Sequence, residues 1–167
     1  MIFDEVFTGL YRLGRLSSAS FLGVQPDISV HAKLLTGGLV PLCATLASES
    51  VFQAFLSSEK SDALLHGHSY TAHAVGCKVA ETSVNLMLAM EKNGDWDDYK
   101  RDWLEPSAQA SNDRDRTLER QTDPHVWSTW SKSFVNDISC VEKVEGVVAL
   151  GSVLAISLRD PAGAGES

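Results

Sequence analysis

The feature that most limits what this chain can fold into is one long helical pattern over residues 72–91. Apolar side chains recur along it, which predicts that the helix is heavily buried: Val75, Val79, Val84, Leu86 and Leu88. The residues that follow, Lys92-Asn93-Gly94, are typical of a helix C-terminus, because glycine readily adopts the left-handed conformation found there. We therefore expect a long helix packed inside a larger structure.

Short β-type segments surround this helix. Residues 1–3, 28–31 and 39–47 precede it and read as three strands, of which the last contains Pro41 and therefore belongs at an edge or a strand start. A fourth apolar, β-rich run over residues 147–158 follows it, interrupted by a glycine. Strands first, helices next and a strand last predict an α/β fold.

Three further segments have helical character. Residues 50–53 fit a capping box that opens a short helix ending near Leu56. Residues 95–123 are rich in charge and carry aromatic residues at near-helical spacing, which predicts a solvated helix followed by a polar loop. Residues 124–138 predict another amphipathic helix.

Composition excludes some functions. The formal net charge of −8 argues against a nucleic-acid partner and against an anionic membrane surface, since both require a basic face. No apolar run approaches the roughly 18 residues of a membrane span. The three cysteines, Cys43, Cys77 and Cys140, show neither disulfide nor metal spacing, so we expect each to be a buried free thiol.

One pair of residues could carry chemistry. Asp4 falls at the C-terminal end of the first predicted strand and Lys33 follows the second, so both lie at carboxyl ends of strands, where α/β proteins form ligand crevices. Pyridoxal phosphate requires these two residue types: an amine that forms a Schiff base, and a carboxylate that keeps the pyridine nitrogen protonated. On this pair alone, the alternative that both are ordinary surface residues stays open.

A second candidate is the histidine- and hydroxyl-rich stretch 66–71 before the long helix. Free backbone N–H groups at a helix N-terminus, together with the hydroxyls of Ser69 and Thr71, suit an anion such as a phosphate. A simple helix cap explains the same residues equally well. A metal site is not expected, because no cysteine or carboxylate completes a familiar spacing with the histidines.

At this point the sequence resembles a known family. Residues 2–14 resemble the Asp-Glu-Val-x-Thr-Gly-x-x-Arg-x-Gly motif of the class III aminotransferases. Residues 32–42 look like the family's cofactor-lysine segment and residues 66–77 like its phosphate-contacting segment, in the family's order. Residues 147–155 resemble the first strand of its small C-terminal domain.

The resemblance implies a fold and a domain organisation. It predicts an α/β chain that is part of a fold type I, pyridoxal-phosphate-binding large domain, with the beginning of a small C-terminal α+β domain. Residues 1–92 would form the C-terminal part of the large domain, and residues 93–167 a charged connecting segment and an incomplete small domain. We accordingly expect the chain to be a fragment of a longer protein.

The resemblance also implies roles for individual residues. Asp4 would pair with the pyridine nitrogen of pyridoxal phosphate, and Val6 would pack against one face of its ring. Lys33 would be the Schiff-base lysine and the base that transfers the proton. Ser69, where the family usually has threonine, would bind the cofactor phosphate. Phe7 stands where many members have a glutamine that contacts the cofactor's phenolic oxygen, so that contact is not expected here.

Within the family, the stretches 66–73 and 148–155 look most like the biotin-synthesis branch in its eukaryotic bifunctional form. That branch implies transamination of 8-amino-7-oxononanoate to 7,8-diaminononanoate, with S-adenosylmethionine as a candidate amino donor. It also implies a homodimeric parent protein in the mitochondrion, with the cytoplasm as the alternative. The isolated chain is expected to be inactive, because it lacks the family's phosphate loop, ring-stacking aromatic residue and substrate-carboxylate arginine.

Two other interpretations stay open. The chain could belong to another class III enzyme, such as an omega-amino acid aminotransferase or an aminomutase, because the same lysine and aspartate serve different reactions. It could also be a truncated, non-catalytic chain whose unpaired sheet edge drives association.

Overall fold

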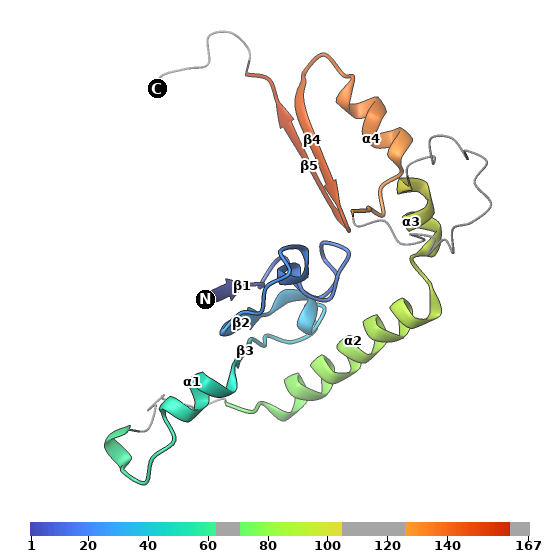
Figure 1. Ribbon diagram of the computed structural model, residues 1–167. Coiled ribbons are helices and arrows are strands. Elements are labelled where there is room, and N and C mark those ends of the chain that lie inside the picture. Colours follow the sequence, from blue (N-terminus) through green and yellow to red (C-terminus); the bar gives the residue numbers. More distant parts are fainter. Residues whose placement is uncertain (63–70, 105–125, 161–167) are drawn as a thin grey trace, which may run out of the picture. The chain divides into compact units, whose positions relative to one another are not determined.

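A computed structural model gives the structure of residues 1–62, 71–104 and 126–160 (Figure 1). The chain divides into two compact units, Met1–Lys92 and Asn93–Ser167, which are described separately below. Among the described residues, no helix has both the length and the apolar character needed to cross a membrane.

The first unit contains a three-stranded sheet in the order β1-β2-β3. Strand β1 (Ile2–Asp4) is parallel to β2 (Ile28–His31), which is antiparallel to β3 (Ala44–Ala47). The first two strands lie where the sequence predicted them. The third was predicted to begin at residue 39 but begins five residues later. Pro41 has no N–H to donate to a ladder, and the carbonyl of Val40 accepts the Thr36 hydroxyl instead, at 2.7 Å.

Short helices fill the connections. The 3-10 helices η1 (Ser18–Phe21) and η2 (Lys33–Leu35) lie before and after β2, and η3 (Lys60–Asp62) follows α1. Helix α1 (Glu49–Ala54) has Ser48 as its N-cap residue, two positions before the predicted capping box, so the prediction of that start was wrong. The Ser48 amide bonds to the Asp27 carbonyl at 2.7 Å, which fixes the chain at this point.

Helix α2 (Ala74–Asn93) confirms the predicted long helix and ends before Gly94, whose φ is +76°. One stripe of it packs on the hairpin between β2 and β3. The core consists of Leu10, Leu35 and Ala80, with Leu34, Leu42, Ala44, Val84 and Met87 around it. The prediction of heavy burial was wrong: Leu86 is 61% exposed, because only one stripe has a partner among the described residues. The predicted burial of the three cysteines was also wrong, since all are exposed.

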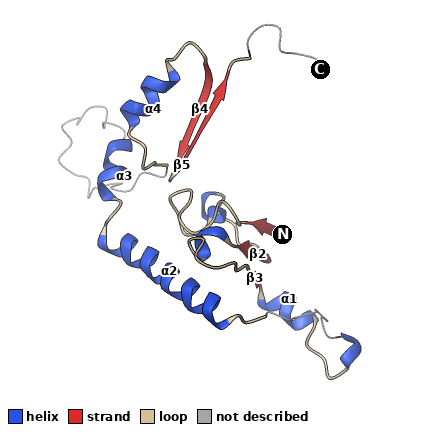
Figure 2. Cartoon of the chain, turned by 180° about the vertical axis from the view of Figure 1, so that it is seen from behind, coloured by secondary structure: helices blue, strands red, loops and turns tan. Residues whose placement is uncertain are grey.

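The second unit contains α3 (Asp97–Trp103), α4 (Lys132–Ser139) and an antiparallel hairpin of β4 (Val144–Leu150) and β5 (Val153–Leu158) (Figure 2). The single predicted strand is therefore two, separated by a turn at Gly151, where φ is +55°. Helix α4 starts later than predicted because the preceding residues are tied to that turn: the buried Ser128 donates its hydroxyl to the Gly151 carbonyl at 2.8 Å. The predicted polar loop lies largely outside the described residues.

Candidate functional site

Asp4 is the last residue of β1 and its side chain is exposed. One carboxylate oxygen accepts the backbone N–H of Val6 at 3.0 Å, which turns the carboxylate towards its own following loop. Because β1 is parallel to β2, with Asp4 opposite Val30, the carboxylate stands at the carboxyl edge of both strands. This is the edge at which α/β sheets form ligand sites.

Lys33 follows β2 and opens η2 at the same edge, three residues beyond the partner of Asp4. Its φ of +49° lies in the left-handed region, which is uncommon for a residue with a Cβ. Such strained backbone occurs preferentially at functional sites, where the surrounding structure holds it. The structure therefore brings Asp4 and Lys33 to one sheet edge, as the sequence predicted.

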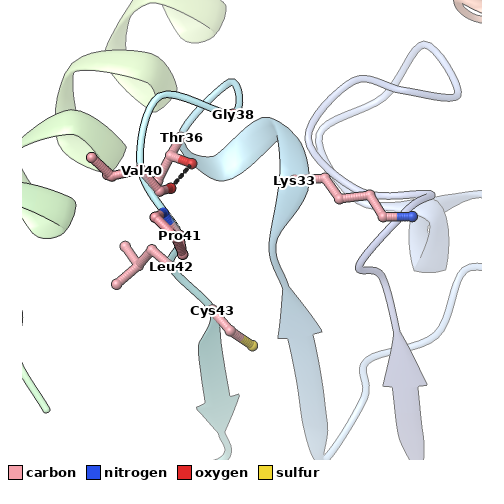
Figure 3. Close-up of a pocket in the computed structure, with 7 residues that line it drawn as sticks. All are labelled: Lys33, Thr36, Gly38, Val40, Pro41, Leu42 and Cys43. Atoms are coloured by element: carbon pink, nitrogen blue, oxygen red, sulfur yellow. Dashed lines mark hydrogen bonds between the residues drawn. The ribbon is translucent and has the colours of Figure 1, made fainter. Parts of the chain in front are cut away.

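The amine of Lys33 lies over the ring of Phe7, with Nζ 4.9 Å from the ring centroid. Figure 3 shows the Lys33 side chain pointing away from the other six labelled residues. Those residues and Lys33 line a pocket of 580 Å³: Thr36, Gly38, Val40, Pro41, Leu42 and Cys43. The amine is therefore directed away from this pocket, and we do not identify the pocket as the place where the lysine acts.

Both charged groups of the site are free to meet a ligand. Within residues 1–62, 71–104 and 126–160, the structure records no ion pair for Asp4 or for Lys33. Both side chains are exposed. An amine and a carboxylate without recorded charged partners, at the carboxyl ends of neighbouring parallel strands, can bind a ligand that offers an electrophilic carbonyl and a basic nitrogen.

Sequence reasoning missed the residue that supports this edge. Glu5 is 1% exposed, and its carboxylate accepts the Ser17 hydroxyl at 2.6 Å and the Ser18 backbone N–H at 3.1 Å. Its own N–H donates to the Val30 carbonyl at 2.9 Å. Glu5 thus fastens the loop after β1 to both β2 and η1. The sequence contained one signal for this role of Glu5. It directly follows the first predicted strand, and four residues later comes Gly9, which has no side chain to crowd it.

Two other predicted site residues have different outcomes. Val6 is half-buried beside Asp4, where an apolar side chain can pack against a bound ring. Ser69, the predicted phosphate ligand, lies outside the described residues. The helix that follows it is capped by His73, whose Nδ1 accepts the backbone N–H of Gly76 at 3.0 Å.

Three comparisons with known proteins agree with one another. A family profile described as "Aminotransferase class-III" matches residues 1–113. The chain is 61% identical over 165 residues to the bifunctional dethiobiotin synthetase/adenosylmethionine-8-amino-7-oxononanoate aminotransferase of Emericella nidulans, covering 99% of this chain and 19% of the relative. It is 45% identical over 159 residues to the mitochondrial bifunctional dethiobiotin synthetase/7,8-diamino-pelargonic acid aminotransferase of Oryza sativa, covering 95% of this chain and 17% of the relative.

A solved structure shows the same fold. The adenosylmethionine-8-amino-7-oxononanoate aminotransferase of Methanocaldococcus jannaschii superposes with a TM-score of 0.69 at 24% identity, covering 94% of this chain and 31% of that one. This likeness confirms the predicted fold class, a partial α/β chain of the type found in these transferases. The chain spans about a fifth of the length of the curated relatives it matches.

Proposed function

Because the chain belongs to the class III aminotransferase family, we propose that it carries the cofactor lysine and the ring-nitrogen carboxylate of a pyridoxal-phosphate-dependent transaminase. The observation that carries this proposal is the placement of Lys33 and Asp4 at one carboxyl edge of the parallel strands β1 and β2. Both residues lie in the part of the chain that the family profile matches.

The residues present fit the cofactor of this family. Asp4 supplies an exposed carboxylate whose one recorded hydrogen bond, from Val6, leaves an oxygen open to a protonated nitrogen. Lys33 supplies an exposed amine that is held by an uncharged ring. This donor set suits the pyridine nitrogen at one end of pyridoxal phosphate and the aldehyde at the other.

The chain's residues would divide the chemistry between them. Pyridoxal phosphate, when bound, supplies an aldehyde that condenses with amines and a ring that accepts electrons from the substrate carbon. Asp4 keeps the proton on the ring nitrogen, because an adjacent carboxylate favours the charged form. Lys33 would hold the cofactor through its amine and would serve as the base that takes the proton from the substrate carbon. Val6 would orient the ring, and Ser69 would donate to the phosphate.

The relatives suggest the substrates. We propose that the parent enzyme converts 8-amino-7-oxononanoate, the keto acceptor, to 7,8-diaminononanoate in biotin synthesis, with S-adenosylmethionine as the amino donor. The name of the Emericella nidulans relative supports this reaction. The name of the Oryza sativa relative supports a mitochondrial location. We also propose a homodimer, as the family resemblance implies.

We further propose that residues 1–92 form the C-terminal part of the cofactor-binding large domain. Residues 93–167 would then form the connecting segment and part of a small C-terminal domain. A chain that spans about a fifth of its relatives provides only part of their site, so we expect the purified chain by itself to show no turnover.

A chimera tests the proposed function. The matching segment of the Emericella nidulans relative is replaced by this chain, and formation of 7,8-diaminononanoate is measured. We expect an active chimera that loses turnover on Lys33→Ala and keeps it on Lys78→Ala, an exposed lysine of α2 that pairs with Glu81. An active chimera unaffected by Lys33→Ala would refute the assignment. Activity only with omega-amino acids would instead favour the other class III reaction that the sequence left open.

A further inference from the structure

The ring of Phe7 is the one recorded contact of the Lys33 amine among the described residues. We propose that Phe7 is a positioning residue: its ring holds the Lys33 ammonium at the sheet edge and keeps it out of an ion pair with Asp4. The consequence for cofactor capture rests on the proposed function, whereas the contact itself does not.

The geometry around Phe7 supports this role. Lys33 Nζ lies 4.9 Å from the ring centroid, and the guanidinium carbon of Arg12 lies 5.3 Å from it. Both distances fall within the range in which a cation is attracted to an aromatic face. Phe7 is 46% exposed, so its ring is not explained by packing in the core. The ring instead meets cations from two segments of the chain.

Without the ring, an ion pair would be the natural alternative. Lys33 and Asp4 stand at the same edge, both are exposed, and opposite charges attract. Two contacts oppose that pairing: the Phe7 ring attracts the ammonium, and the Val6 N–H holds the Asp4 carboxylate towards the backbone. An uncharged ring can hold the amine without neutralising the carboxylate.

This separation prepares both groups for the proposed reaction. Once the ammonium has lost a proton to solvent, the free amine can condense with an aldehyde and release water, and the carboxylate remains open to a ring nitrogen, so no ion pair has to be broken first. The long lysine side chain is also restricted before the ligand arrives, which lowers the entropy lost on capture. Replacement of Phe7 by an aliphatic residue should therefore slow capture even though Phe7 bonds to no reacting atom.

The test compares Phe7→Leu, which removes the ring, with Phe7→Trp, which retains an aromatic face. Phe21→Leu is the matched control, because Phe21 carries a similar contact to Arg15, at 4.6 Å, but none to Lys33. The first readout is the NMR chemical shift of the Lys33 ε-methylene group in the full chain without cofactor, assigned with Lys33→Arg. We expect the ring-current shift to be lost in Phe7→Leu and kept in Phe7→Trp and Phe21→Leu.

The second readout is the rate at which pyridoxal phosphate and borohydride label Lys33 in the chimera that tests the proposed function, carrying the same substitutions. We expect Phe7→Leu to slow labelling about two- to five-fold, equivalent to about 0.5–1 kcal/mol, with Phe7→Trp close to wild type. An unchanged Lys33 shift in Phe7→Leu would overturn the positioning role, even if Lys33 is labelled normally. A shift that responds as expected in the chain, together with a chimera whose Lys33 is never labelled, would support the positioning role and count against the proposed function.

Discussion

The buried carboxylate of Glu5 provides the sharpest test of how the site edge is built. Glu5→Ala removes a side chain that is 1% exposed and that accepts hydrogen bonds from Ser17 and Ser18 at 2.6 and 3.1 Å. Both donors would be left without this acceptor, and a cavity would form beside Gly9. Glu5→Gln keeps the shape but places an amide NH2 where one of the donors now points.

The size of the effect follows from these contacts. A partly buried donor that loses its acceptor costs about 1–3 kcal/mol, and more when the lost acceptor was charged. Two such donors and a cavity predict a loss of about 3–5 kcal/mol of unfolding free energy for Glu5→Ala. For Glu5→Gln, which still offers one oxygen, we expect about 2 kcal/mol. Either loss is large beside the 5–15 kcal/mol that is typical of a folded domain.

The assay is urea unfolding of the purified chain followed by far-ultraviolet circular dichroism. Tryptophan fluorescence would be less suitable, since all four tryptophans lie in the other unit, at positions 96, 103, 127 and 130. Glu81→Gln is the matched control, because its exposed ion pair with Lys78 is worth less than about 1 kcal/mol. A loss below about 1 kcal/mol for Glu5→Ala would refute the account of Glu5 as the anchor of this edge.

Gly9 offers an independent check on the same contact. A Cβ built on Gly9 would lie 2.9 Å from a carboxylate oxygen of Glu5 and 3.0 Å from its backbone oxygen. The backbone oxygen cannot move aside cheaply, so Gly9→Ala should destabilise the chain by about 1–3 kcal/mol in the same assay. An alanine tolerated without cost would mean that the Glu5 loop is looser than the structure indicates.

Two further predictions concern other anchoring points. Ser83→Ala removes the 2.9 Å hydrogen bond from α2 to the Leu34 carbonyl, and we expect a loss of about 1 kcal/mol in urea unfolding together with altered NMR shifts for Lys33. Ser128→Ala removes the buried hydroxyl that donates to the Gly151 carbonyl at 2.8 Å and accepts from the backbone N–H of Trp130 at 3.2 Å. We expect it to lower the unfolding free energy seen by tryptophan fluorescence by about 1–3 kcal/mol, and no change there would contradict the assigned hydrogen bonds.

The sequence predicted the fold best where a local sequence pattern agreed with the packing of the folded chain. Strand β2 and helix α2 carry their own periodicity and stop signals, and the structure places both close to the predicted bounds. The placement of Asp4 and Lys33 was predictable because residues at the carboxyl ends of adjacent parallel strands share an edge. The family motifs are the reason for predicting that this pair is a cofactor site rather than two ordinary surface residues.

The remainder depended on contacts that no local pattern encodes. The start of β3 is set by the Thr36 hydroxyl, and the late start of α4 by the tie between Ser128 and Gly151, a contact over 23 residues. Apolar periodicity in α2 indicated which residues could be buried but could not say that only one stripe would meet a partner. The contact between Phe7 and Lys33 joins the turn after β1 to the start of η2 and has no signature in the sequence.

The central claim is that Lys33 is the cofactor lysine, and chemical trapping tests it most directly. The active chimera is incubated with pyridoxal phosphate, reduced with borohydride and digested, and the modified peptide is identified by mass spectrometry. The account predicts a phosphopyridoxyl group on Lys33, and none at any position in the Lys33→Ala variant. A modification carried by another lysine and retained in Lys33→Ala would contradict the claim.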